Sequence, residues 1–117
     1  MCTPFSALPV DLQNTLKTHD AFHDVQFEGK MLQRAPQLQV TTVKYALNDV
    51  FVIGHVHAEK IPLFWRVKYI VNVDACWVLC GKILYPISFD SHLHAYRVRF
   101  DKHWTVLKPG DEHTVIP

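Results

Sequence analysis

Apolar and polar residues alternate along most of the chain, which predicts a mostly β protein. Alternation with a period of two is typical of strands that bury one of their two faces. The runs are rich in β-branched and aromatic residues, and turn-forming residues separate them. The predicted strands are residues 38–46, 50–57, 63–73, 76–86, 94–100 and 104–107, with a further short strand at 25–27.

The alternation also predicts which side of the long strands is buried. In residues 63–73 one face is almost wholly apolar and the other carries Arg66 and Lys68. A strand with one polar face turns its apolar face toward the core. In residues 76–86 we expect the face of Trp77 to be buried, with a bend at Gly81 and another irregularity at Gly54 in the preceding strand. The side chains expected to point inward are Trp65, Val67, Tyr69, Val71, Trp77 and Tyr96.

The first part of the chain differs from the rest and predicts one short helix. Pro9 is suited to the first helical turn, because its fixed φ is already helical and the N–H it lacks would be unpaired there. A helix of this length is not stable alone, so it must pack on the β domain. We therefore divide the chain into an N-terminal lead-in, residues 1–36, and a β domain, residues 37–117. The apolar side of the helix is formed by Val10, Leu12 and Leu16.

The length and strand spacing predict the fold class. A chain of 117 residues is of single-domain size and long enough to bury a core. Short antiparallel strands at close spacing are typical of small barrels and sandwiches. We expect an antiparallel barrel of five to seven strands, of the Src-homology or Tudor type, with a short N-terminal helix.

Composition and charge exclude several classes of protein. Hydrophobic residues make up 49% of the chain and charged residues 20%, which excludes a wholly disordered protein. The 12 Lys and Arg residues against 11 Asp and Glu give no overall field that would hold nucleic acid without specificity. Eight His residues add positive charge in mild acid.

The cysteines and the apolar runs bear on the compartment. Cys76 and Cys80 lie four residues apart on one predicted strand, about 13 Å at the strand rise, too far for a disulfide between them. A reduced, intracellular protein, cytoplasmic or nuclear, is the better interpretation. The N-terminus lacks a secretory pattern, and charged residues interrupt every long apolar run, so we expect neither secretion nor a membrane span.

Two His-x-His pairs are the sharpest chemical feature. On a strand, residues two apart point to the same face, so each pair offers two imidazoles to one metal ion. A further ligand from a neighbouring strand would complete a zinc or iron site. Glu59 follows the first pair, but its spacing and the missing glycines depart from the cupin pattern. The alternative is that these are ordinary surface histidines. The candidate ligands are His55, His57, His92 and His94.

Basic residues on the polar strand faces form a second candidate site. Small barrels bind single strands of nucleic acid through surfaces that combine basic and aromatic side chains. The alternative is that the charges are solvated faces of amphipathic strands. Catalytic chemistry has less support, because the carboxylates are scattered and a thiol within a strand is usually inert. The candidate nucleic-acid-binding residues are Arg66, Lys68, Arg97 and Arg99.

Four runs in the middle of the chain form a recognisable pattern: Asn48-Asp-Val-Phe-Val52, Val67-Lys-Tyr-Ile-Val71, Trp77-Val-Leu79 and, above all, the closing run Phe89-Asp-Ser-His-Leu-His-Ala-Tyr-Arg-Val98. With these runs, residues 45–98 resemble a segment of large, uncharacterised proteins from transposon-rich animal genomes, some of them domesticated mobile-element products. The resemblance covers about half of the chain and implies a non-enzymatic accessory module of barrel type. It implies no active site, and Arg97 stands where such segments often have Glu.

Three functions follow from the sequence, in order of preference. The first is a non-enzymatic interaction module with a protein partner and no cofactor. The second is a metal-binding β domain, with or without enzymatic activity, built on the His pairs. The third is a small barrel that binds nucleic acid. The chain ends at Pro117 without a cap, from which we expect missing sequence or a partner.

Overall fold

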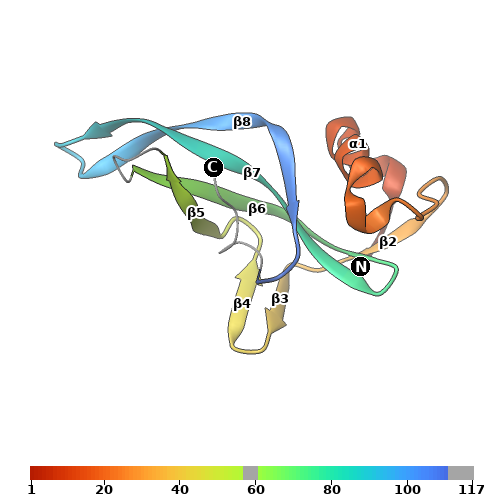
Figure 1. The fold of residues 1–117 in the computed structure, drawn as a ribbon. Coiled ribbons are helices and arrows are strands. Elements are labelled where there is room, and N and C mark those ends of the chain that lie inside the picture. Colours follow the sequence, from red (N-terminus) through yellow and green to blue (C-terminus); the bar gives the residue numbers. More distant parts are fainter. Residues whose placement is uncertain (57–60, 111–117) are drawn as a thin grey trace.

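The computed structural model of the chain describes residues 1–56 and 61–110, and the protein is mostly β, as predicted (Figure 1). One α-helix, α1 (Val10–Thr18), lies between two 3₁₀ turns, η1 (Phe5–Ala7) and η2 (Asp20–Phe22). The strands are β1 (Cys2–Pro4), β2 (Met31–Arg34), β3 (Gln37–Val40), β4 (Val43–Ala46), β5 (Val50–Val56), β6 (Ile61–Val73), β7 (Cys76–Asp90) and β8 (Ala95–Leu107). Within the described part of the chain, no helix is long and apolar enough to cross a membrane.

The sheet is antiparallel and open, so the prediction of a closed barrel is wrong. Its strand order is β1-β2-β6-β7-β8, and β5 pairs with the first half of β6. β3 and β4 form a separate two-stranded hairpin. Closure would require the two edges of the sheet to meet, but β7 and β8 run on together, away from the rest of the sheet, as a long hairpin (Figure 1). The described strands therefore leave the sheet with edges.

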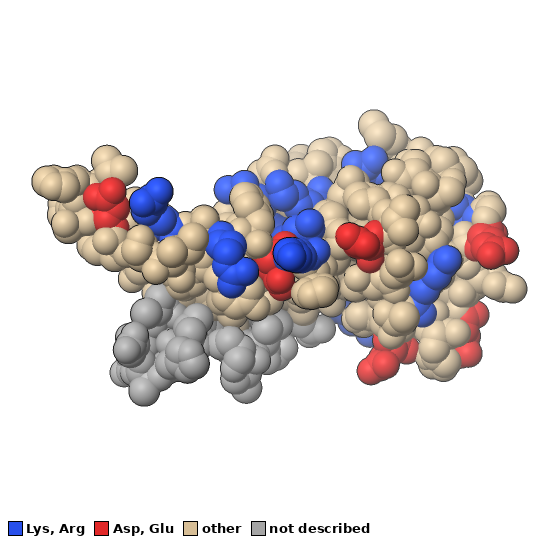
Figure 2. Space-filling model, turned by 90° about the horizontal axis from the view of Figure 1, so that it is seen from above, with Lys and Arg blue, Asp and Glu red and all other residues tan. Residues whose placement is uncertain are grey.

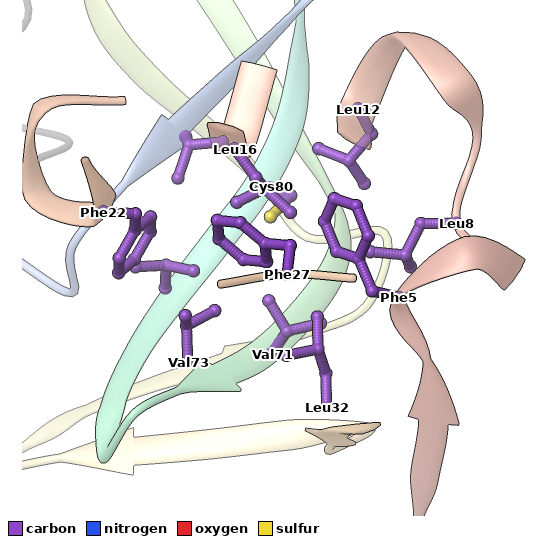
Figure 3. Close-up of a cluster of buried hydrophobic side chains, with 12 residues drawn as sticks. Phe5, Leu8, Leu12, Leu16, Phe22, Phe27, Leu32, Val71, Val73 and Cys80 are labelled. Carbon is purple, nitrogen blue, oxygen red and sulfur yellow. The ribbon is translucent and has the colours of Figure 1, made fainter. Parts of the chain in front are cut away.

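The helical end of the molecule covers one face of the sheet (Figure 1). Leu12 and Leu16 lie one turn apart on α1, and both are fully buried. The rings of Phe5 and Phe27 pack 4.5 Å apart between centroids, in the same cluster. Figure 3 shows these side chains around Cys80 of β7. Burying one such side chain contributes about 1.5–3 kcal/mol, and this holds a nine-residue helix that would not form alone. Val10, expected on the apolar side of the helix, is exposed.

A second core lies where the β3–β4 hairpin and β5 pack on β6 and β7. Its largest members are Tyr45 and Trp65, both almost completely buried. The segment between β4 and β5 is held to β6 by two backbone bonds: the Asn48 N–H donates to the Val67 carbonyl at 2.8 Å, and the Val67 N–H donates to the Asp49 carbonyl at 3.0 Å. The hairpin is thereby fixed to the middle of β6.

A bulge in β6 connects the two cores and corrects the predicted buried face. The register shifts between Val67 and Tyr69, so Lys68 is an extra residue without a partner on β7. Trp65 and Val67 therefore belong to the second core, whereas Tyr69 and Val71 pack in the helical core. The prediction that all four share one face is wrong, although Trp65, Val67 and Val71 are buried.

β7 is likewise covered on both sides along part of its length. On the predicted face, Leu79 is buried but Trp77 is half-buried. On the other face, Val78 and Cys80 are fully buried under the helical layer. The prediction of a single buried face fails here because two layers, one helical and one β, cover opposite sides of the same strands.

Several predicted boundaries also change. Thr41 has φ 56° and starts a turn that divides the predicted strand 38–46 into β3 and β4. Strands 94–100 and 104–107 are one strand, β8, in which the register skips from Trp104 to Phe100. The strand predicted to end at residue 86 continues to Asp90 as β7. Residues 25–27 are not a strand, while 31–34 are. The irregularity expected at Gly54 is confirmed by a register shift there.

Candidate binding surfaces

The outer half of the β7–β8 hairpin projects from the molecule as an arm, defined here as residues 86–100. It lies at the end of the sheet opposite the helical layer (Figure 1). Every residue from 91 to 100 is exposed. Large apolar side chains are nevertheless frequent in the arm, with exposures from 38% at Val98 to 74% at Leu93. The exposed apolar residues are Ile87, Phe89, Leu93, Tyr96, Val98 and Phe100.

The tip of the arm is an ordered turn. The carboxylate of Asp90 accepts hydrogen bonds from the backbone N–H groups of His92 at 3.0 Å and Leu93 at 3.2 Å. His94 takes a left-handed conformation, φ 48°, which closes the turn. A shallow depression of about 320 Å³ lies beside the tip, lined by Pro86, Ile87, Ser88, Phe89 and Tyr96.

A second surface runs along the sheet from the helical layer onto the arm. We call it the aromatic-basic face and define it by Phe64, Arg66, Lys68, Lys82, Tyr96, Phe100 and Trp104. The register aligns five of these residues in two cross-strand rows, and Lys68 and Tyr96 join them through contacts with Phe100 and Phe64. Arg66 of β6 faces Lys82 of β7, which faces Trp104 of β8. In the next row, Phe64 and Phe100 flank the buried Leu84. Residues directly opposite one another share a face, so the rows form one surface.

Cations lie over the aromatic rings on this face. The Lys82 Nζ is 4.8 Å from the centroid of the Trp104 ring. The Arg66 Cζ and the Lys68 Nζ are 5.5 and 5.6 Å from the centroid of the Phe100 ring. A cation over a ring face is attracted by the electrons of the ring, by about 0.5–1 kcal/mol at exposed sites. These contacts hold the cations close to the sheet.

The same cations have no carboxylate partner within the part of the chain that the structure describes. The ion pairs found there are Lys30–Asp74, at 2.6 Å, and His23–Asp24, at 3.2 Å. The Nε of Arg66 is buried and has no hydrogen-bond partner among these residues. Seen from above Figure 1, with α1 and β8 toward the viewer, Lys and Arg side chains gather over the middle of the molecule, with Asp or Glu side chains among them (Figure 2). The aromatic-basic face itself carries the cations of Arg66, Lys68 and Lys82, although the whole chain is nearly neutral.

The four basic residues predicted for nucleic-acid binding lie on two different faces. Arg66 and Lys68 contact Phe100. Arg99 is the neighbour of Phe100 in the strand and points the other way, with its Cζ 5.2 Å from the centroid of the Tyr85 ring. Arg97 shares the side of Arg99. The structure therefore pairs Arg66 with Lys68, and separates both from the arginines of the arm.

The predicted histidine ligands are only partly described. His92 and His94 lie in the exposed turn of the arm rather than side by side on a strand. His55 lies in β5 opposite Pro62, and His57 lies outside the described residues. Among residues whose side chains the structure describes, no three His, Cys, Asp or Glu side chains are grouped to hold a metal ion. Zinc or iron binding by the His pairs stays a prediction.

The cysteines show why nucleophilic chemistry has little support. Cys2 is exposed, Cys76 is half-buried, and neither forms a disulfide. Cys80 lies in the helical core, where burial raises its pKa to about 12. A thiol that stays protonated near neutral pH is a poor nucleophile.

Of the seven residues of the aromatic-basic face, the sequence prediction named only Arg66 and Lys68 as binding residues. It missed Lys82, Trp104 and the rings of Phe64, Tyr96 and Phe100. The signal for Lys82 was present, because it alternates with the apolar residues of β7 just as Arg66 does in β6. No comparable signal existed for Trp104. Its place opposite Lys82 depends on the irregular register of β8.

Comparisons with known proteins do not extend this description. No family model, no curated protein and no solved structure matches the chain. The resemblance of residues 45–98 to mobile-element proteins, and the accessory role that it implies, therefore stay predictions.

Proposed function

We propose that the protein is a non-enzymatic binding module that captures an extended protein segment along β8 in the arm. The observation that carries the proposal is the exposure of the arm. A two-stranded hairpin is marginally stable in water, yet this one presents a row of large apolar side chains to solvent. A third strand would place its own side chains beside this row and so reduce its exposure.

The position of β8 supports strand addition as the mode of binding. β8 is the last strand of the sheet, and within the described part of the chain it pairs with β7 alone. An edge strand offers backbone N–H and C=O groups to an incoming strand, and side-chain contacts then supply specificity. The helix packs over the second half of β8, where Trp104 and Val106 join its cluster, so the free half is the arm.

The alternation within β8 indicates the chemistry of the partner. Tyr96, Val98 and Phe100 lie on one face, and Arg97 and Arg99 lie on the other. A partner strand that alternates apolar and acidic residues would place apolar side chains beside the first face and carboxylates beside the second. Opposite charges on neighbouring strands contribute about 0.2–1 kcal/mol per pair. The same arginines disfavour pairing of β8 with a second copy of itself, because like charges would then approach.

The experiment is a charge swap. Fluorescence anisotropy would measure the binding of two labelled peptides, one alternating Val and Glu and the other alternating Val and Lys. We expect the native protein to prefer the Glu peptide. The variant R97E/R99E should invert that preference, with the affinity for the Glu peptide falling about five- to ten-fold.

The control variant K44E/K108E changes the charge equally on residues outside the arm and should keep the original preference. Circular dichroism would verify that both variants are folded. Binding of neither peptide, or an unchanged preference in R97E/R99E, would contradict the proposal.

A further inference from the structure

We infer that the aromatic-basic face binds single-stranded nucleic acid, at a site distinct from the edge of β8. This inference does not depend on the capture of a protein segment. It rests on the cross-strand rows of β6, β7 and β8 and on the cations held over their rings.

The first argument is the combination of groups. Proteins that bind single strands combine cations that follow the phosphate backbone with aromatic rings on which bases stack. Here Arg66, Lys68 and Lys82 supply the cations. Tyr96 and Phe100 supply rings that are 40% and 48% exposed, so part of each ring is open to a ligand.

The second argument is the continuity of the rings. The Phe64 and Tyr96 rings lie 6.0 Å apart between centroids, and the Tyr96 and Phe89 rings lie 5.2 Å apart. Arg66 and Lys68 contact Phe100, and the next row of the face ends at Trp104. Successive bases along one strand therefore find successive rings between Trp104 and the arm.

The third argument is that the cations of this face have no carboxylate partner among the described residues. A cation that already has a carboxylate partner would have to break that pair to bind a phosphate, but the described residues hold no such pair on this face. Phosphate oxygens are acceptors that ammonium and guanidinium groups bind well, so these cations can bind a phosphate without first losing a carboxylate partner.

The shape and charge of the molecule favour a single strand over a duplex. Stacking requires unpaired bases, whose faces a duplex hides. Duplex binding without specificity depends on many phosphate contacts, and a chain with a net charge of +1 supplies few. The groove of about 410 Å³ at the helical end of the face includes Asp11, so we place the ligand path from Trp104 toward the arm.

The test uses fluorescence anisotropy of the full chain with a labelled oligothymidine, an oligouridine and a duplex of the same length. We expect both single strands to bind at low salt and the duplex to bind at least ten-fold more weakly. With three cations engaged, log K should fall against log salt with a slope of about −2, from about 0.7 per phosphate.

Variants then assign the site. Phe100→Ala should weaken binding at least about five-fold, because base–aromatic stacking contributes about 1–3 kcal/mol per base. K68Q/K82Q should weaken binding and bring the slope closer to zero. K44Q/K108Q removes the same charge elsewhere and should match the native protein.

Three results would overturn the inference: no binding to either single strand at low salt, equal binding of duplex and single strand, or equal losses in K68Q/K82Q and K44Q/K108Q. Competition by polyglutamate as strong as that by oligothymidine would show that the face binds acidic polymers in general, and would also overturn it. None of these results bears on the charge swap at Arg97 and Arg99, so the two proposals fail separately.

Discussion

Among the described glycines, Gly81 is the one at which an added methyl group should destabilise the fold most. It lies in β7 opposite Val67, which adjoins the bulge in β6. Before the bulge, Trp65 and Val67 pack in the second core, and after it Tyr69 and Val71 pack in the helical core. A Cβ built on Gly81 would overlap the backbone carbonyl of Arg66 and would lie 2.7 Å from the Cε2 and 2.8 Å from the Nε1 of Trp65. Trp65 is fully buried, so its ring has no free space into which it can turn.

The loss of stability depends on which atoms must move to make room for the added methyl group. Adding a methyl group to a well-packed core usually costs about 1–3 kcal/mol. Here one obstacle is backbone within a paired strand and the other is a fixed indole ring, so we expect the upper end, about 3 kcal/mol. For a chain of this size each kcal/mol lowers Tm by about 4 °C, so Gly81→Ala should lower Tm by about 12 °C.

Urea unfolding followed by tryptophan fluorescence would measure the change, with Gly29→Ala as the control. Gly29 has φ 70° and open space around it, so that substitution reports backbone strain alone, about 1 kcal/mol. Trp65→Phe should partly rescue Gly81→Ala in a double-mutant cycle, because it removes the Nε1. A loss below about 0.5 kcal/mol in Gly81→Ala, or strictly additive effects in the cycle, would refute the reasoning.

Further predictions concern Cys80, Asp49 and Phe89. In a labelling experiment with a thiol reagent at pH 8, Cys2 should react at once and Cys80 only on global unfolding, because Cys80 is buried and its pKa is raised to about 12. The folded pKa of Cys80 lies above the unfolded value of 9.0, so the buried, protonated thiol contributes fully to stability below pH 9. As the pH rises toward 12 this contribution is lost, which should lower the free energy of unfolding by up to about 4 kcal/mol. Urea titrations across this pH range should show the loss, and the variant Cys80→Val should lack it. The Ala46 N–H donates to the Asp49 carboxylate at 2.9 Å, so Asp49→Ala should lower the free energy of unfolding by about 1 kcal/mol in the same assay. Phe89 is exposed, so Phe89→Ser should change the free energy of unfolding by less than about 1 kcal/mol.

The strands themselves could be predicted from the sequence because alternation is a local signal. It placed β5, β6 and β7 and the turn before Cys76, and Pro9 located the start of α1. The turn at Thr41 could not be predicted in this way, since it lacks the Gly, Asn or Asp that usually marks a left-handed residue. Nor does any local pattern announce Lys68 as a bulge, because a bulge is a property of two paired strands.

The same limit explains why the fold class and the burial of Tyr96 were predicted wrongly. A closed barrel and an open sheet with two covering layers have similar strand lengths and similar alternation. The two folds differ in whether the edge strands of the sheet pair with each other, and a local pattern does not show this. Tyr96, expected to be an inward anchor, is 40% exposed because the strands that carry it continue beyond the other layers. The aromatic-basic face likewise depends on register: Lys82 and Trp104 become neighbours only through the irregular pairing of β8.

β8 connects the two proposed sites, because Tyr96 and Phe100 belong to the aromatic-basic face and also lie along the edge on which the peptide would bind. A strand bound along its edge would extend the sheet beyond β8 and would place its own apolar side chains beside Tyr96, Val98 and Phe100. That neighbour would widen the aromatic-basic face without touching Lys68 or Lys82. A bound peptide should therefore strengthen the binding of oligothymidine, and by linkage oligothymidine should strengthen the binding of the peptide by the same factor. Competition between the two ligands would instead mean that both occupy the same face, and that the assignment of the peptide to the edge is wrong.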